Sequence, residues 1–300
     1  MTIVLGADDV VIDLPRLADE LTAALRAGPT GSGQRVRAQV TPDITAMVLL
    51  PGLAPTIPAY TVKVHAKNPN RSPAITGVIC LHDLATGDLL ALIDSARLTA
   101  LRTGLGGALG AHLLADPGAR HVTVIGAGAQ GRAQLEALAA LRPIDSVQIR
   151  DTDPAAEERF SAWAEGLGIT TSAAGPSGTG AIVLMATWSR TPVLHQVPPG
   201  THVTSLGADE PGKVELAPAL LAGALVVVDD PELAHVPADA AIGEVLRGEH
   251  PGRTSADQVT VYSPAGLPMQ DLVIAWHVYR NASRRRPAVF DVGMSRPQQT

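Results

Sequence analysis

The sequence predicts an α/β protein that contains a Rossmann-type, doubly wound parallel sheet. Past residue 95, apolar strand patterns alternate with helical patterns, and this alternation is typical of right-handed βαβ units. Within that region, the stretch VTVIGAGAQGRAQLEAL places glycines at the spacing G-x-G-x-x-G between a strand pattern and a helix pattern. The first third of the chain carries short strand patterns instead, so we expect a second, mostly β part.

Composition limits the classes of protein to which the chain can belong. Its 300 residues, 46% hydrophobic and 17% charged, fit a globular protein with one large domain or two. The net charge of −6, with no dense basic run before RNASRRRP, makes nucleic acid an unexpected partner. No apolar run approaches the roughly 20 residues that cross a bilayer, and the opening segment does not resemble a signal peptide. One cysteine forms no internal disulfide and lacks the partners of a zinc site. We expect a cytoplasmic protein without a metal.

The first third is expected to hold one helix followed by strands. Apolar residues at helical spacing predict a helix over LPRLADELTAALRAG, with Asp13 as its N-cap and Gly28 at its end. Turn-prone stretches then separate the strand patterns RVRAQV, TAMVLL, AYTVKVHA, AITGVICLHDL and LLALID. The stretch LATGDLLAL predicts a hairpin with Thr-Gly-Asp at its tip.

The remainder alternates helices and strands. A small-residue helix over SARLTALRTGLGGALGAHLLA precedes the strand HVTVI, a helix from Gln130 to Ala140 and the strand SVQIRD. A helix from Pro154 to Leu167 and the strands AIVLMAT and HVTSLGA follow. The last elements are a helix near LAPALLAG, the strands ALVVVDD and QVTVYS, and a helix from about Leu267 to 282. The stretch SAAGPSGTG is expected to be a surface loop.

The glycine motif predicts a dinucleotide site because its context fits. Gly126 allows a tight turn, Gly128 lets a pyrophosphate approach the backbone, and Gly131 lets the helix pack close to the strand. Asp151 follows the next strand 20 residues after Gly131, where a carboxylate binds the ribose hydroxyls of NAD. The neighbouring Arg150 leaves NADP open, because an arginine there can accommodate a 2′-phosphate.

Five ordered blocks resemble the ornithine cyclodeaminase/μ-crystallin family. They are TVKVHAKNPN, ALIDSARLTALRTG, the long stretch from LTALRTG to GRAQLEAL, SLGADEPGKVEL and GLPMQDLVIAWHVYRNA, and they span about residues 13 to 282. The resemblance implies a homodimer and a Rossmann domain at 116–261. That domain would be inserted in a discontinuous α+β substrate-binding and dimerisation domain made of 1–115 plus 262–300.

The resemblance also implies the substrate site. Lys63 would face the substrate carboxylate or the reacting nitrogen, although its mid-strand position alone favours an outward lysine on a solvated face. Arg102 would clamp a carboxylate through its guanidinium fork, with a helix-end salt bridge as the alternative. Arg37 would be a further carboxylate ligand, with Arg35 as its rival.

Asp209 follows the strand HVTSL and corresponds to the acid/base of one branch of the family. It would take a proton from a substrate ammonium or activate water against an imine, whereas an Asx turn or N-cap is the structural alternative. Reductases of the μ-crystallin type often lack an acid at this position. The full set of expected cofactor-binding residues is Thr103, Gly126, Gly128, Ala129, Gln130, Gly131, Asp151 and Thr187.

Two departures from the family pattern concern the substrate. Val48 stands where ornithine cyclodeaminases carry a glutamate for the distal amine, and valine accepts no hydrogen bond. Ser263 and Pro264 replace the family's serine segment on the nicotinamide side.

The leading hypothesis is an NAD(P)-dependent oxidoreductase that moves a hydride at the C–N carbon of a small α-amino or α-imino acid. This would be an amino acid dehydrogenase or a ketimine or cyclic imine reductase. The alternative is an NAD-dependent cyclodeaminase of ornithine or a related diamino acid. A third hypothesis is a protein that binds a nucleotide without turnover. The three expected cationic residues and Asp209 are all present, which disfavours that hypothesis.

Overall fold

The chain forms two compact units in a computed structural model. The described residues are 2–28, 36–38, 46–68, 71, 74–172, 181–207, 212–282 and 289–290. The first unit comprises 1–13, 29–99 and 267–300, and the second comprises 14–28 and 100–266. These boundaries differ from the division expected from the sequence, because the helix at 14–27 and residues 100–115 group with the second unit. No described helix could cross a membrane.

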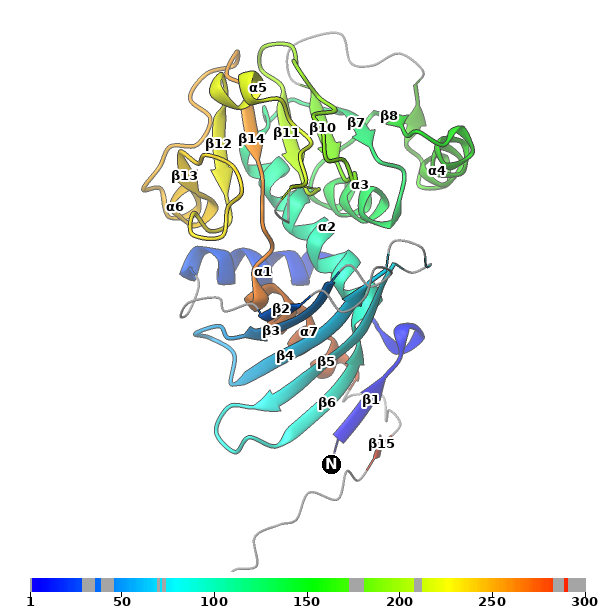
Figure 1. The fold of residues 1–300 in the computed structure, drawn as a ribbon, viewed down its shortest axis with the longest axis vertical. Helices are drawn as coiled ribbons and strands as arrows, with labels where there is room; N and C mark the ends of the chain where they lie inside the picture. The colour runs from blue at the N-terminus through cyan, green and yellow to red at the C-terminus, as the bar shows by residue number, and fades with distance from the viewer. Residues whose placement is uncertain are drawn as a thin grey trace, which may run out of the picture. The chain divides into compact units, whose positions relative to one another are not determined.

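The first unit is built on a mixed sheet with the strand order β15-β1-β6-β5-β4-β3-β2 (Figure 1). β1 pairs with β6 in parallel, and the other described pairings are antiparallel. The elements are β1 (Thr2–Leu5), η1 (Ala7–Asp9), β2 (Val36–Ala38), β3 (Ala46–Gly52), β4 (Ala59–Lys67), β5 (Ile75–Asp83), β6 (Leu89–Asp94), α7 (Pro268–Ala282) and β15 (Val289–Phe290).

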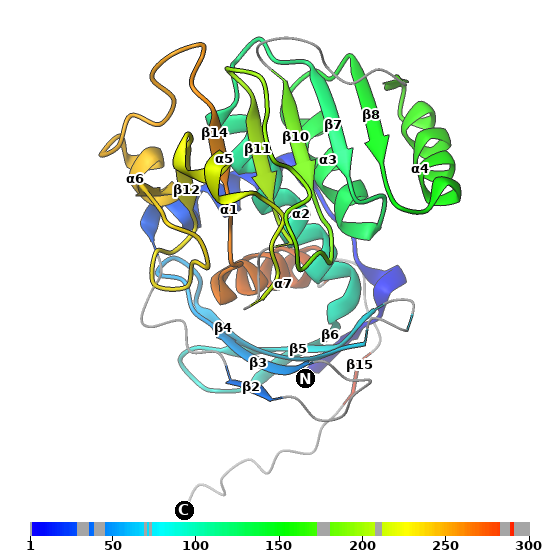
Figure 2. The same cartoon turned by 45° about the horizontal axis from the view of Figure 1, so that its top comes forward.

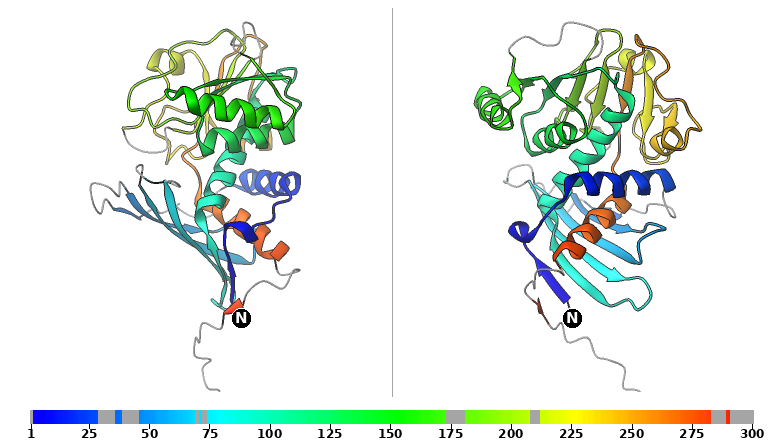
Figure 3. Two further views of the ribbon diagram at one scale, coloured as in Figure 1. Left: turned by 90° about the vertical axis from the view of Figure 1, so that its right-hand side faces the viewer. Right: turned by 180° about the vertical axis from the view of Figure 1, so that it is seen from behind.

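The predicted hairpin connects β5 to β6. Oδ1 of Asp83 accepts hydrogen bonds from the amides of Ala85 and Thr86, both at 2.9 Å, and Gly87 turns the chain with φ +76°. These contacts form an Asx-type turn that starts at Asp83, one residue before the stretch from which the hairpin was predicted. Helix α7 packs against β3, β4 and β5, so one face of the sheet is covered (Figures 2 and 3).

The second unit contains a parallel sheet with the order β13-β12-β14-β11-β10-β7-β8-β9. Its central strands are buried on both faces, which explains their nearly continuous apolar sequences. The strands are β7 (His121–Ile125), β8 (Ser146–Arg150), β9 (Thr170–Thr171), β10 (Ile182–Met185), β11 (His202–Ser205), β12 (Leu225–Val228), β13 (Ala240–Ala241) and β14 (Thr260–Tyr262). The helices are α1 (Leu14–Ala27), α3 (Ala129–Leu141), α4 (Pro154–Gly166), α5 (Pro218–Ala222) and α6 (Ile242–Arg247), and α2 (Ser95–Leu114) begins in the first unit.

The strand order reverses at β7. The chain proceeds from β7 to β8 and β9 on one side, and β10 and β11 lie on the other side (Figure 2). In a doubly wound sheet, ligands bind outside the carboxyl ends of the strands at such a switch point. The observed fold is therefore the predicted Rossmann-type α/β arrangement.

The glycines of α2 let that helix lie directly on its neighbours. A Cβ atom added at Gly104 would lie 2.5 Å from the carbonyl carbon of Ala133 in α3. One added at Gly110 would overlap the ring of Tyr262 in β14. The small residues of α2 are thus required because this helix packs very closely against α3 and β14.

A polar cluster lies inside the second unit at β11. His202 is fully buried, with its Nδ1 2.8 Å from the hydroxyl of Thr260 and its Nε2 3.0 Å from the hydroxyl of Thr204. Burial, together with the charges of Arg253 and Arg142, lowers the pKa of His202 to about 3. The imidazole is therefore neutral near neutral pH.

Replacing Gly104 with alanine tests the close helix contact. Gly104→Ala should lower the free energy of unfolding by about 1–3 kcal/mol, because the backbone of α3 cannot yield as a flexible side chain would. The matched control is Gly166→Ala at the end of α4, where an added Cβ meets nothing within 4 Å. That control should be neutral or stabilising by about 0.4–1 kcal/mol. Equal urea midpoints for the two variants would contradict the proposed crowding.

Candidate functional site

The three motif glycines occupy three different environments. Gly126 has φ +105°, and a Cβ atom there would lie 2.5 Å from the carbonyl oxygen of Ala186 after β10. A Cβ at Gly128 would meet nothing within 4 Å, so the space before the helix is open. A Cβ at Gly131 would overlap the carbonyl oxygen of Gly126 and touch Val124 at 3.0 Å. Turn, open approach and close packing are the three functions that a dinucleotide loop requires.

The N-terminus of α3 offers a place for an anion. Gly128 is its N-cap and provides no side-chain cap for the first helical amides. Those amides and the helix dipole attract a phosphate. Oε1 of Gln130 is buried without a hydrogen-bond partner in the first turn. The open approach at Gly128 and the uncapped amides both fit the phosphates of a dinucleotide, so the residues present suit this cofactor.

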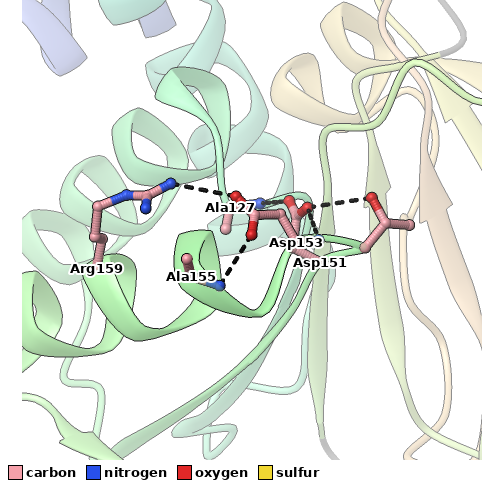
Figure 4. Close-up of polar contacts among 6 residues, drawn as sticks. Ala127, Asp151, Asp153, Ala155 and Arg159 are labelled. Atoms are coloured by element: carbon pink, nitrogen blue, oxygen red, sulfur yellow. Dashed lines mark hydrogen bonds and ion pairs between the residues drawn. The ribbon is translucent and has the colours of Figure 1, made fainter.

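Asp151 joins the end of β8 to the glycine loop. Its Oδ2 accepts from the amide of Ala127 at 2.7 Å, and its Oδ1 accepts from the amide of Asp153 at 3.0 Å. Figure 4 shows this contact beside Asp153, which caps α4 through the amide of Ala155 at 3.0 Å and pairs with Arg159 at 3.3 Å. Each carboxylate oxygen has two lone-pair positions, so Asp151 retains the capacity to accept from ribose hydroxyls.

The ionisation of Asp151 follows from the same contacts. Partial burial acts to raise its pKa, but hydrogen bonds from the amides of Asp153 and Ala127 outweigh it and lower the pKa below the usual aspartate range. Asp151 therefore carries its negative charge at neutral pH. Arg150 precedes it and is exposed.

Glu215 is a buried acid beside the candidate site that the sequence patterns did not single out. It is fully buried beyond the ends of β10 and β11, and it contacts Thr187, one of the expected cofactor-binding residues. The available signal was an acid between apolar neighbours in the stretch GKVEL. Such a position also suits an exposed carboxylate near a helix start, so the pattern did not single it out.

Lys63 points into the covered side of the first unit, which excludes the outward orientation. Its side chain is fully buried, and its Nζ lies 2.8 Å from Oδ1 and 2.7 Å from Oδ2 of Asp271 in α7. Burial along β4 alternates, so that Thr61, Lys63 and His65 share the buried face. Because unpaired buried charges are very costly, the carboxylate of Asp271 is what makes this lysine tolerable.

The other expected substrate residues lie in different settings. Arg102 is half-buried in α2, and its Nη1 lies 2.6 Å from the position that a Cβ on Gly266 would occupy. Thr103 is also half-buried in α2. The backbone of Arg37 lies in β2, but its side chain is outside the described part of the structure, as are all of Arg35 and Asp209.

The two departures from the family pattern have clear positions. Val48 is buried in β3 directly opposite His65, on the face of the sheet that holds Lys63. No hydrogen-bond acceptor is therefore present at this position. Ser263 is buried after β14, and its amide donates to the carbonyl of Val227 at 2.9 Å. Among the described residues, no cluster of three or more metal-ligating side chains occurs.

Comparison with known proteins places these features in a family. The sequence model described as the ornithine cyclodeaminase/mu-crystallin family matches residues 9–286. The chain is 34% identical over 242 residues to the alanine dehydrogenase of Archaeoglobus fulgidus, covering 74% of this chain and 75% of that protein. It is 29% identical over 266 residues to a Delta(1)-pyrroline-2-carboxylate reductase of Bacillus cereus, covering 79% and 82%.

Solved structures of proteins from the same family share this fold. An archaeal alanine dehydrogenase dimer with bound NAD superimposes with a TM-score of 0.89 at 28% identity, covering 97% of this chain and 99% of that one. A lysine cyclodeaminase, described with recognition of L-lysine, L-ornithine and L-2,4-diamino butyric acid, gives a TM-score of 0.82 at 27% identity, covering 96% and 94%.

The buried ion pair can be tested by removing its cation. Lys63→Met leaves the carboxylate of Asp271 without this ammonium and should lower the free energy of unfolding by about 3–5 kcal/mol. The double variant Lys63→Met/Asp271→Leu should recover most of that loss. As a control, Arg120→Met removes an exposed pair with Asp145 at 4.0 Å and should cost at most about 1 kcal/mol. If Lys63→Met unfolds at the same urea concentration as this control, the pair is not stabilised as described.

Proposed function

The chain belongs to the ornithine cyclodeaminase/mu-crystallin family, and we propose that it is an NAD(P)-dependent oxidoreductase acting on the C–N carbon of a small α-amino or α-imino acid. It would be an amino acid dehydrogenase or a ketimine or cyclic imine reductase. The observation that carries the proposal is the glycine loop of α3, whose open cradle lies beside the ionised Asp151. Its relatives include an alanine dehydrogenase and a pyrroline-2-carboxylate reductase.

The proposed roles follow from the chemistry of the side chains. When bound, the nicotinamide cofactor accepts or supplies the hydride. Lys63, which is paired with Asp271, would suit a substrate carboxylate as a hydrogen-bond donor, and Arg37 and Arg102 would add further cationic donors. Asp209 would move the proton at the substrate nitrogen.

The cyclodeaminase alternative requires a group for a distal amine. Val48 supplies none on the face that holds Lys63, and this favours a substrate without a second amine. A cyclodeaminase returns its hydride to the same carbon, so it would release ammonia without net change in NADH.

Absorbance at 340 nm tests the proposal. Purified protein should give multi-turnover change with NAD and one of a panel of amino acids, or with NADH and a cyclic imino acid or α-keto acid plus ammonia. Asp209→Asn should abolish turnover and leave NADH binding intact. Ammonia release from a diamino acid without net absorbance change would assign the cyclodeaminase activity instead. Loss of both turnover and NADH binding in Asp209→Asn would mean a structural role for that residue.

Asp151 should determine the choice between NAD and NADP. Asp151→Ser removes charge-assisted hydrogen bonds to a ribose, so NADH should bind at least about tenfold more weakly while NADPH gains. Because the pKa of Asp151 lies below its usual value of about 4, wild-type affinity should not change through this group between about pH 5 and 8. Asp145→Ser, at an exposed site before β8, is the control and should change neither affinity. Unchanged NADH affinity in Asp151→Ser would contradict the assignment.

We further propose a homodimer that pairs the uncovered face of the first sheet. On that face Val62 and Val64 of β4 lie beside Val78 and Cys80 of β5 and Leu92 of β6, all half-buried in one chain. A contiguous apolar patch of this kind is typical of an interface. The similar archaeal alanine dehydrogenase is described as a dimer. The single cysteine is consistent with the cytoplasmic location that we also propose.

A charge in the middle of this face should prevent association. Val64 stands between Leu49 and Val78 in the register, so Val64→Lys should convert the dimer to a monomer by light scattering. Val193→Lys, on an exposed position of the second unit, should leave the mass unchanged. A dimeric Val64→Lys variant would show that another surface associates.

A further inference from the structure

We propose that Glu215 is a positioning residue that makes Thr187 a hydrogen-bond acceptor for the nicotinamide half of the cofactor. This inference rests on the proposed function, because it assigns a contact of the same dinucleotide site. Neither residue belongs to the glycine loop, and they lie beyond the strands on the other side of β7.

Glu215 is a buried carboxylate satisfied by four uncharged donors. Its Oε1 accepts from the amide of Thr187 at 2.6 Å and from the hydroxyl of the same residue at 2.8 Å. Its Oε2 accepts from the hydroxyl of Ser205 at 2.7 Å and from the amide of Gly207 at 2.8 Å. A Cβ atom at Gly207 would overlap the carboxylate, so a glycine is needed there. One side chain thus joins the segments that follow β10 and β11.

These contacts fix what Thr187 can offer to a ligand. A hydroxyl has one proton to donate and two lone pairs to accept with. The proton of Thr187 and its amide are both directed at Glu215, and one lone pair is approached by the amide of Ser189 at 3.4 Å. The remaining capacity is that of an acceptor. Thr187 therefore suits an N–H or O–H donor, such as a carboxamide or a ribose hydroxyl, and not a phosphate oxygen.

The position along the sheet selects the half of the cofactor. In a doubly wound sheet, the dinucleotide lies across the switch point, with one mononucleotide on each side. Asp151 follows β8 and belongs to the adenosine side, whereas Thr187 follows β10 on the opposite side of β7. The nicotinamide carboxamide and its ribose supply the donors that Thr187 can accept.

The carboxylate cannot be exchanged for an amide without conflict. In Glu215→Gln, one oxygen becomes an NH2 group that faces either the amide of Thr187 or the amide of Gly207. Both orientations bring two donors together in a buried place, where an unsatisfied donor is costly. We therefore expect Glu215→Gln to displace Thr187 while the glycine loop and Asp151 stay in place.

Calorimetric titration with NADH and with ADP-ribose, which lacks nicotinamide, separates the two halves of the site. Glu215→Gln and Thr187→Val should weaken NADH binding about tenfold and leave ADP-ribose affinity unchanged. Thr187→Ser, which retains the hydroxyl, should bind NADH as the wild type does. The control Glu244→Gln alters a carboxylate that accepts from the amide of Ala241 at the start of α6, and should affect neither ligand.

Other binding results for these variants would contradict the roles proposed for Thr187 and Glu215. Equal losses for NADH and ADP-ribose in Thr187→Val would mean that Thr187 only maintains the fold, and no loss would mean that it does not contact the cofactor. If Glu215→Gln does not fold, Glu215→Asp replaces it, because the shorter side chain withdraws the carboxylate from the amide and the hydroxyl of Thr187. An unchanged ratio of the two affinities in that variant would refute the positioning role. Wild-type protein that binds neither ligand would refute the proposed function itself.

Discussion

The carboxyl edge of the parallel sheet depends on carboxylates that accept hydrogen bonds from the backbone of neighbouring segments. Asp151 binds the amide of Ala127, and Glu215 binds the amide of Gly207. Asp229 after β12 accepts from the amides of Ala265 at 2.9 Å and Gly266 at 2.7 Å after β14. Strand ends in a parallel sheet leave irregular backbone with polar groups that must be paired. Acidic side chains meet that need and fix the loops where ligands of such folds bind.

The first unit solves a different problem, which is how to hold a cation inside a sheet-and-helix core. Lys63 and Asp271 come from β4 and α7, and each makes the burial of the other tolerable. The ion pair also fixes the position of the Lys63 ammonium, which would otherwise move with its flexible side chain. In the second unit, therefore, buried carboxylates bind backbone amides, whereas in the first unit a buried carboxylate binds the ammonium of a lysine.

Much of the fold was predictable, because local patterns and turn chemistry agree with the tertiary structure. The helix expected from Gln130 to Ala140 begins one residue earlier and ends one residue later, and the glycine spacing correctly gave the turn, the open approach and the close packing. β1 was missed because the four residues TIVL are too short a run to show a period, and the strand is defined by its pairing with β6 and β15. The inward orientation of Lys63 and the burial of Glu215 depend on partners distant in sequence, which no local pattern contains.

The neutral His202 has a consequence for behaviour in acid. Its pKa in the folded protein is about 3, far below the value near 6.5 of an unfolded chain, so the unfolded state binds the proton first. The stability that the neutral ring contributes is complete above about pH 6.5 and declines progressively toward pH 3. In mildly acidic surroundings, the ring would stay neutral while the second unit is folded, and protonation of the same side chain in the unfolded chain would draw the equilibrium toward unfolding.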